Sequence, residues 1–304
     1  MIKTWPPFSY VAVQMTSNPF MEEASIAWAF NRRDLTATVV PFSLFTLASS
    51  LEAGLPLSSV ILNASKSALL SFLLLYTFTI SNQLNGIEED RLNKPDRPIV
   101  SGRVSISAAY TRYIIISMAC LLLSYKIQAG LGATMFLICG AIHNFTSVSS
   151  FGPTKDLVTT ATLVSGLYSG WELGRGNTKK GIEWISCLAV NLLFSISIQD
   201  LRDVVGDAAT GRYTTPYILG KPYDRIYIAI CMLSIRALTL KKQYLDSSHK
   251  FTANACAVVV LIADMFLVVR IFNFQTIKED KKTYSLYMAR FSLELFLASF
   301  ILSS

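Results

Sequence analysis

The chain has 304 residues, of which 52% are hydrophobic and 15% are charged. Soluble domains carry about 25% charged residues, so this composition excludes an ordinary soluble protein. The net charge of +7 would suggest a nucleic-acid partner in a soluble protein. In a membrane chain, however, the location of the lysines and arginines matters more than their sum, and we expect no nucleic-acid partner.

Apolar residues collect repeatedly into runs of about 20, the length that crosses a hydrocarbon core roughly 30 Å thick. The sequence therefore predicts an all-α membrane protein with nine transmembrane helices, at residues 35–55, 58–82, 105–125, 128–149, 156–173, 182–199, 222–240, 251–274 and 284–302. Residues 1–30 lack a signal-peptide pattern and are expected to form a peripheral segment, which leaves 31–304 as the transmembrane domain. The cysteines fall within the apolar runs in odd number and are interpreted as packing residues: Cys120, Cys139, Cys187, Cys231 and Cys256.

The lysines and arginines are unevenly distributed over the two sides that nine spans define. Fifteen of the 27 fall on the side of the N-terminus, seven fall on the opposite side, and five lie within spans: Lys66, Arg112, Arg236, Arg270 and Arg290. The positive-inside rule then places the N-terminal side in the cytosol. Many of these basic residues lie beside acidic motifs, so the excess has a second explanation as phosphate ligands.

Two stretches on this side, each at the end of a predicted span, concentrate the acidic residues. The first is NQLNGIEEDRLNKPDRPIVSG, from Asn82 to Gly102, and the second is QDLRDVVGDAATGRYTTPYILG, from Gln199 to Gly220. Acidic residues at a membrane helix end are costly to bury without partners and are functional candidates by default. The two stretches share a spacing, and each continues to a proline and then a glycine, which is a weak internal repeat.

Spacing within each stretch places oxygen side chains on one face of a continuous helix. The members of these two faces are Asn82, Glu89 and Asp90 in the first stretch and Asp200, Asp203 and Asp207 in the second. Facing carboxylate and amide oxygens suit Mg²⁺, which commonly binds one or two carboxylates together with substrate phosphates. Either stretch alone is equally well explained as a solvated, capped helix end with local ion pairs, whereas both together favour a magnesium–diphosphate site.

Basic residues supply the other partners of a magnesium-bound diphosphate, because Arg binds phosphate through a bidentate fork and Lys acts as a point charge. The candidates are Arg97, Arg202, Lys155 in the loop FGPTKD, and Arg32 or Arg33 at the entry to the first span. For Arg32, Arg33, Arg202 and Arg212, topology or surface pairing is an equally good explanation. His143 is expected to make an interhelical hydrogen bond rather than act as a base, and Lys66 and Asp264 are assigned no role.

The first stretch resembles the signature of the UbiA-type intramembrane prenyltransferase superfamily. That signature runs Asn-Asp-x-x-Asp-x-x-x-Asp and continues to Arg-Pro-Ile-x-x-Gly, and the matching residues are Asn82, Asp90, Asn93, Pro95, Arg97, Pro98, Ile99 and Gly102. The family's second motif, Asp-x-x-x-Asp followed by Gly and Pro, is matched by Asp203, Asp207, Gly211 and Pro216. The resemblance covers about residues 30–304 and implies nine helices around a central cavity that binds the Mg²⁺ diphosphate of an isoprenoid.

Departures from this signature point to one branch of the superfamily. Gln83 and Gly86 replace two acidic positions, while Glu89 precedes the retained Asp90. This pattern, followed by Asn-Lys-Pro-x-Arg-Pro-Ile, is similar to the fungal branch that includes membrane-bound sesquiterpene cyclases, as is the stretch RRDLTATVVP. The resemblance implies a metal set of Asn82, Glu89, Asp90, Asp203 and Asp207, with the three aspartates catalytic, and diphosphate contacts by Lys155 and Arg97, to which the basic candidates add Arg202 and Arg32.

The leading hypothesis is a Mg²⁺-dependent terpene cyclase that ionises farnesyl diphosphate and cyclises the allylic cation to a sesquiterpene, releasing diphosphate. The alternative is a UbiA-type prenyltransferase that moves the prenyl group to an aromatic acceptor. A secondary transporter is a third hypothesis, but it predicts polar residues near mid-membrane, whereas these motifs lie at span ends.

We expect a multi-pass protein of the endoplasmic reticulum or another internal membrane, with its motifs cytosolic and no protein partner. Aromatic faces can stabilise a carbocation. The candidates here are Phe72, Tyr76, Phe78, Phe145, Tyr168, Trp171 and Phe194.

Overall fold

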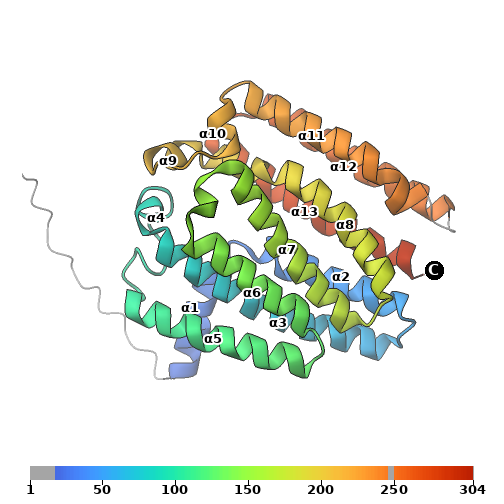
Figure 1. Cartoon of the computed structure of the whole chain (residues 1–304), viewed down its shortest axis with the longest axis horizontal. Coiled ribbons are helices and arrows are strands. Elements are labelled where there is room, and N and C mark those ends of the chain that lie inside the picture. The colour runs from blue at the N-terminus through green and yellow to red at the C-terminus, as the bar shows by residue number, and fades with distance from the viewer. Residues whose placement is uncertain (1–17, 246–249, 304) are drawn as a thin grey trace, which may run out of the picture.

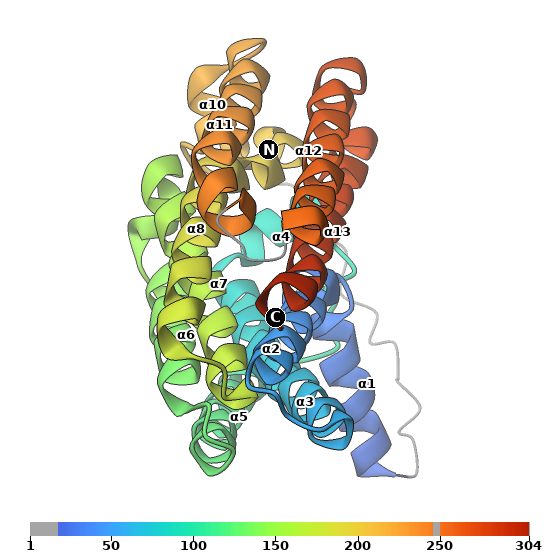
Figure 2. The ribbon, with the colours of Figure 1, turned by 90° about the vertical axis from the view of Figure 1, so that its right-hand side faces the viewer.

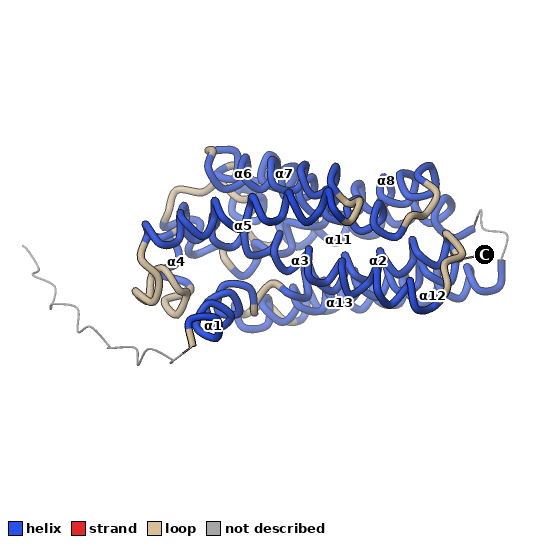
Figure 3. The backbone as a smooth tube through the Cα atoms, turned by 90° about the horizontal axis from the view of Figure 1, so that it is seen from below, coloured by secondary structure: helices blue, strands red, loops and turns tan. Residues whose placement is uncertain are grey.

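The computed structural model describes residues 18–245 and 250–303, which form helices joined by short loops (Figure 1). The long helices run side by side along the longest axis of the molecule (Figures 1 and 3). Within the described residues a helix lies at each of the nine predicted ranges: α2 (Val39–Glu52), α3 (Leu57–Asn85), α5 (Ile106–Lys126), α6 (Gly130–Phe145), α7 (Gly152–Gly174), α8 (Thr178–Ser195), α11 (Tyr223–Leu240), α12 (Lys250–Asn273) and α13 (Ile277–Leu302). The all-α prediction is confirmed.

Six helical segments of the described chain are long and apolar enough to cross a membrane: Leu35–Glu52, Leu57–Asn85, Ile106–Lys126, Thr178–Arg202, Lys250–Asn273 and Ile277–Leu302. Helix α6 is apolar but has 16 residues, and α7 and α11 do not meet the same criterion. Helix α7 is rich in Thr, Ser and Gly because it packs closely against α2. A Cβ atom on Gly166 would lie 2.0 Å from the ring of Phe42, so only glycine allows this approach.

Seen along the bundle, α11 and α12 lie at one edge and α3 and α5 at the opposite edge (Figure 2). A separate helix, α1 (Pro19–Asn31), packs Ile26 and Phe30 against Tyr76 and Ile80 of α3. It belongs to the predicted peripheral segment, of which residues 1–17 lie outside the described chain. The five cysteines are free, as expected for packing residues.

Short helices gather at one end of the bundle, where both acidic stretches lie (Figure 1). They are α4 (Ile87–Asn93), α9 (Val204–Ala209), α10 (Thr215–Leu219) and a 3₁₀ segment, η3 (Ile196–Arg202). Helices α4 and α9 touch so closely that a Cβ atom on Gly206 would lie 2.0 Å from Nδ2 of Asn93. This contact joins the first acidic stretch to the second.

Neither acidic stretch forms the continuous helix that the spacing predicts. Helix α3 stops at Asn85, because Gly86 departs from helical geometry with φ −99° and ψ 27° before α4 begins. Helix α8 stops at Ser195 and passes into the tighter 3₁₀ turns of η3, so Asp203 separates η3 from α9. The acidic side chains are therefore brought together by breaks in the helices.

A buried charge cluster joins α11, α12 and α13 through Arg236, Asp264, Arg290 and Glu294. Arg236 donates to Glu294 at 2.7 Å and to Asp264 at 2.9 Å. Arg290 contacts Asp264 at 2.6 Å and donates to Glu294 at 2.8 Å. Asp264, which has no obvious partner in the sequence, thus finds two arginines from predicted spans, whereas Lys66 is half-buried on α3.

Candidate active site

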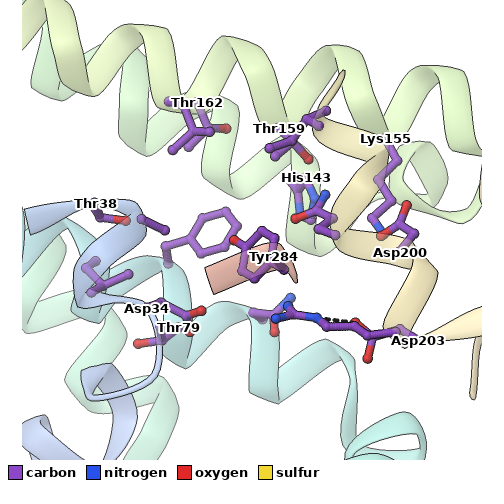
Figure 4. A pocket seen from close by; sticks show the side chains of 18 of the residues that line it. Asp34, Thr38, Thr79, His143, Lys155, Thr159, Thr162, Asp200, Asp203 and Tyr284 are labelled. Atoms are coloured by element: carbon purple, nitrogen blue, oxygen red, sulfur yellow. Dashed lines mark hydrogen bonds and ion pairs between the residues drawn. The ribbon is translucent and has the colours of Figure 1, made fainter. Parts of the chain in front are cut away.

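A pocket of about 160 Å³ extends from the short helices into the bundle (Figure 4). Its charged side chains come from α4, α7, η3 and the adjoining loops, and they are Asp34, Glu89, Lys94, Arg97, Lys155, Asp200, Arg202, Asp203 and Arg212. Farther along α3, α6 and α7 the lining is apolar or hydroxylic, with Leu75, Phe78, Phe136, Thr159, Thr162 and Leu163. The pocket therefore offers a charged end and an apolar end.

Arg97 holds the first acidic stretch together. Its Nη1 donates to Oδ1 of Asn82 at 3.2 Å and to Oδ2 of Asp90 at 2.7 Å. Asp90 is only 2% exposed and lies behind Arg97 rather than on the pocket wall. Burial raises the pKa of Asp90, although the Arg97 guanidinium opposes this shift. Asn82 and Arg97 both line the pocket.

Arg212 connects the two acidic stretches. Its guanidinium donates to Glu89 of α4 and lies 3.6 Å from Oδ1 of Asp207 in α9. Asp207 accepts a hydrogen bond from Thr214 at 3.0 Å, and burial raises its pKa to about 6. From the sequence, ligand binding and surface pairing are equally good explanations for Arg212, because nothing local indicates that it faces the first stretch.

Lys155 and Asp200 form a buried ion pair at the charged end (Figure 4). The carboxylate of Asp200 is 1% exposed, and its Oδ2 has no hydrogen-bond partner, like Oδ1 of Asp207. Asp203 pairs with Arg202 at 3.2 Å. Burial raises the pKa of Asp203, but the nearby Lys94 and Arg202 outweigh it and hold that pKa below its ordinary value.

Arg202 is held by stacking as well as by charge. Its guanidinium carbon lies 4.1 Å from the centre of the Tyr284 ring, which comes from α13. Arg32 is not brought to the pocket: it forms an exposed ion pair with Asp96 at 2.9 Å, and Arg33 contacts the same carboxylate. Both arginines therefore form surface ion pairs, which is the alternative explanation that the sequence left open.

The donor set at the charged end has the chemistry of a hard-cation site. Carboxylate or amide oxygens of Asn82, Glu89, Asp200 and Asp203 line the pocket, and carboxylate oxygens are the ligands that Mg²⁺ prefers. In residues 18–245 and 250–303 no group of three or more His, Cys, Asp or Glu is close enough to hold a metal. The carboxylates of Glu89, Asp200 and Asp203 each pair with a lysine or arginine, while the orphaned oxygens of Asp200 and Asp207 leave acceptor capacity unused.

Several pocket residues were not identified from the sequence, namely Asp34, Lys94, Phe136 and Tyr284. Of the seven aromatic candidates, Phe78 lines the pocket, whereas Trp171 packs against Phe45 in the core. Phe78 precedes Asn82 by four positions and so shares its helix face. This spacing alone predicts that Phe78 lies on the same side of the helix as the site residue Asn82. His143 lines the pocket too, but its Nδ1 bonds Asn144 of its own helix at 2.8 Å, and within the described chain the imidazole makes no hydrogen bond to another helix.

Comparison with known proteins identifies the family. The UbiA prenyltransferase family model matches residues 38–299. Somaliensene A/B synthase of Streptomyces somaliensis is 31% identical over 206 residues, which cover 68% of this chain and 69% of that protein. The diterpene cyclase eriG and the polyprenyl transferase eriF of Hericium erinaceus are each 29% identical over 91% of this chain, and the matches cover 88% and 94% of their own lengths.

The fold agrees with this assignment. A UbiA homologue from Archaeoglobus fulgidus bound to GPP and Mg²⁺ superposes with a TM-score of 0.71 at 16% identity, covering 91% of this chain and 99% of that one. The relatives include terpene cyclases and prenyltransferases of bacteria and fungi. The chain is a helical membrane protein that belongs to the UbiA prenyltransferase family.

Proposed function

We propose that the protein is a Mg²⁺-dependent terpene cyclase that ionises farnesyl diphosphate and closes the resulting cation into a sesquiterpene. The observation that carries the proposal is the pocket itself, which joins a cluster of cations and carboxylates to an apolar, aromatic chamber within the bundle. The similarity to the diterpene cyclase eriG and to somaliensene A/B synthase supports cyclisation, and the Archaeoglobus fulgidus homologue supports a prenyl diphosphate bound with Mg²⁺.

In this proposal both acidic stretches hold the metal and the arginines and lysines hold the diphosphate. The metal ligands are Asn82, Glu89, Asp90, Asp203 and Asp207, and the unpaired oxygen and pocket position of Asp200 add it to the set. Mg²⁺ would supply Lewis-acid neutralisation of the leaving diphosphate. Lys155, Arg97 and Arg202 would donate to the same oxygens, and Arg212, which now pairs with Glu89, joins them as a fourth donor.

The apolar lining then shields the allylic cation from water. Phe78 and Phe136 lie 6.3 Å apart, centre to centre, and present aromatic rings to the chamber. The helices would form nine spans in the endoplasmic reticulum or another internal membrane, with the charged end of the pocket cytosolic. No protein partner is needed for the reaction.

Product analysis tests the proposal. Membranes that contain the protein are incubated with farnesyl diphosphate and Mg²⁺ without an acceptor, and we expect a cyclic C15 hydrocarbon and released diphosphate. Glu89→Gln should lower turnover by about 10²-fold or more, whereas the matched Glu88→Gln, whose side chain is 77% exposed on the surface, should not. Cyclic products from geranylgeranyl diphosphate alone would overturn the substrate assignment.

Transfer to an aromatic acceptor is the second candidate function, favoured by the similarity to the polyprenyl transferase eriF. It uses the same diphosphate site but requires an acceptor for turnover. Substrate that stays intact until an aromatic acceptor is added would overturn the cyclase and support the transferase.

A further inference from the structure

His143 lies between two pockets at the charged end of the bundle. Its side chain lines the diphosphate pocket and also a second, polar pocket of about 270 Å³ on its other side. The ring is 5.3 Å from the ring of Phe78, centre to centre, and the residue is 6% exposed. The second pocket reaches the surface at Asn85, so it connects the imidazole with solvent.

Hydrogen bonds around Asn144 determine which nitrogen of His143 carries the proton. Nδ2 of Asn144 donates to the backbone carbonyl of Phe78 at 3.2 Å and to Oγ of Ser81 at 2.8 Å. Because the carbonyl can only accept, the amide orientation of Asn144 is fixed, and its Oδ1 faces Nδ1 of His143 at 2.8 Å. Nδ1 must therefore carry a proton, so in the neutral imidazole Nε2 is the nitrogen with the free lone pair.

The same chain of hydrogen bonds extends to the diphosphate site. Oδ1 of Asn144 also accepts from Nδ2 of Asn82 at 3.3 Å, and Oδ1 of Asn82 accepts from Arg97 at 3.2 Å. The donor and acceptor roles are consistent at every step of this hydrogen-bond series, from the guanidinium of Arg97 to the imidazole of His143. Lys155 and Arg212 line the same pocket as His143.

We propose that His143 is the base that ends the cyclisation, with Asn144 as its positioning residue; this rests on the cyclase function proposed above. Nε2 removes a proton from the carbon next to the cationic centre, and the electrons of that C–H bond form the new C=C bond. The positive charge passes from the carbocation to the imidazolium, whose proton then leaves to solvent through the second pocket. Diphosphate departs as the anion released at ionisation, so charge and atoms balance.

Other groups near the chamber are poorer bases. Thr159 lines the pocket with a buried hydroxyl that has no partner, but a hydroxyl is far less basic than a neutral imidazole. The phenol of Tyr284 carries its own proton, and its ring is occupied by Arg202. The remaining competitors are the carboxylate of Asp34, which also lines the pocket, and the released diphosphate, and the experiment separates both from His143.

The test compares diphosphate release with product identity in His143→Phe, which keeps an aromatic ring against Phe78 and removes both nitrogens. We expect diphosphate release within about threefold of wild type. Formation of the native olefin should fall at least about tenfold, because a positioned base contributes about 10²–10⁴-fold. The missing product should appear as water-quenched alcohols or earlier olefins. Ile142→Phe, on the exposed neighbouring position of α6, is the matched control.

A second variant, His143→Ala, guards against misfolding of the first, and added imidazole should restore its native olefin fraction through the second pocket. An unchanged product profile in both variants overturns the assignment and leaves the deprotonation to Asp34 or to diphosphate. Equal loss of diphosphate release and olefin, without rescue by imidazole, overturns it in favour of a structural role. If the wild-type protein releases no diphosphate without an acceptor, the proposed cyclase function is overturned too. This result differs from both outcomes above, which concern only the His143 variants.

Discussion

Glu294→Gln is expected to destabilise the protein through the buried charge cluster of Arg236, Asp264, Arg290 and Glu294. Glu294 has no exposed surface, and it accepts from Arg236 at 2.7 and 3.0 Å and from Arg290 at 2.8 Å. The two arginines and two carboxylates cancel in charge while none is more than 8% exposed. Glutamine keeps the size and one acceptor oxygen but leaves two guanidinium groups with a single carboxylate.

The magnitude follows from the cost of an uncompensated buried charge. Removing one partner of a buried ion pair costs about 3–5 kcal/mol. At roughly 2 °C per kcal/mol for a chain of this size, the melting temperature should fall by about 6–10 °C. The assay is thermal unfolding of the purified protein in detergent at fixed pH and salt.

A matched control separates burial from the chemistry of the substitution. Glu88→Gln removes an exposed ion pair with Arg91, whose side chain is 60% exposed, and should cost less than about 1 kcal/mol. Replacing both Arg236 and Glu294 by apolar residues of similar volume should recover much of the loss. A Glu294→Gln protein that melts within about 1 °C of wild type would refute the reasoning, because the cluster would then be solvated or unformed.

Three further perturbations probe the site. With Mg²⁺ chelated, burial raises the pKa of Asp207 from 3.8 to about 6. The free energy of unfolding should therefore fall as the pH rises between these two values. Above the higher value, the ionised carboxylate of Asp207 should lower the free energy of unfolding by roughly 3 kcal/mol. Asp207→Asn should therefore raise the melting temperature at pH 7.5 more than at pH 4, and equal shifts would contradict this. Lys155→Met leaves the carboxylate of Asp200 buried and unpaired, so melting should show a loss of about 3–5 kcal/mol that Asp200→Asn largely reverses. Gly206→Ala would place a Cβ atom 2.0 Å from Nδ2 of Asn93, so either the Asn93 side chain turns away or α9 moves from α4, and steady-state turnover should fall by about tenfold if α9 moves.

The helices were predictable because the apolar runs are long and the charged residues sparse. Each predicted range contains a helix within the described chain, and both acidic stretches lie at the same end of the bundle. The alternation of span ends along the chain is sufficient to predict this. The breaks at Gly86 and Ser195 were less accessible, since a helix-compatible spacing continues across both positions.

The partners of the charged residues could not be predicted, because they come from helices far apart in the sequence. Arg212 reaches Glu89 across 123 positions, and Asp264 meets Arg236 and Arg290 from two other helices. No local period encodes such pairings. Basic residues within predicted spans nevertheless indicate buried ion pairs, because a buried arginine needs a carboxylate partner. Two of the five such residues, Arg236 and Arg290, pair with carboxylates in the charge cluster.

The charge cluster and the pocket are connected through α13. The ring of Tyr284 stacks against Arg202, and Glu294 belongs to the charge cluster. The two residues lie ten positions apart on this helix, or about 15 Å along its axis. An α-helix of this length is stiff, so fixing the rotation and height of α13 at Glu294 also fixes the ring at Tyr284. Hydrophobic contacts alone would tolerate a slide along the helix, whereas a bidentate guanidinium–carboxylate contact does not. The buried charges, which contribute little net stability, thereby set where Arg202, the arginine proposed to bind diphosphate, lies in the pocket.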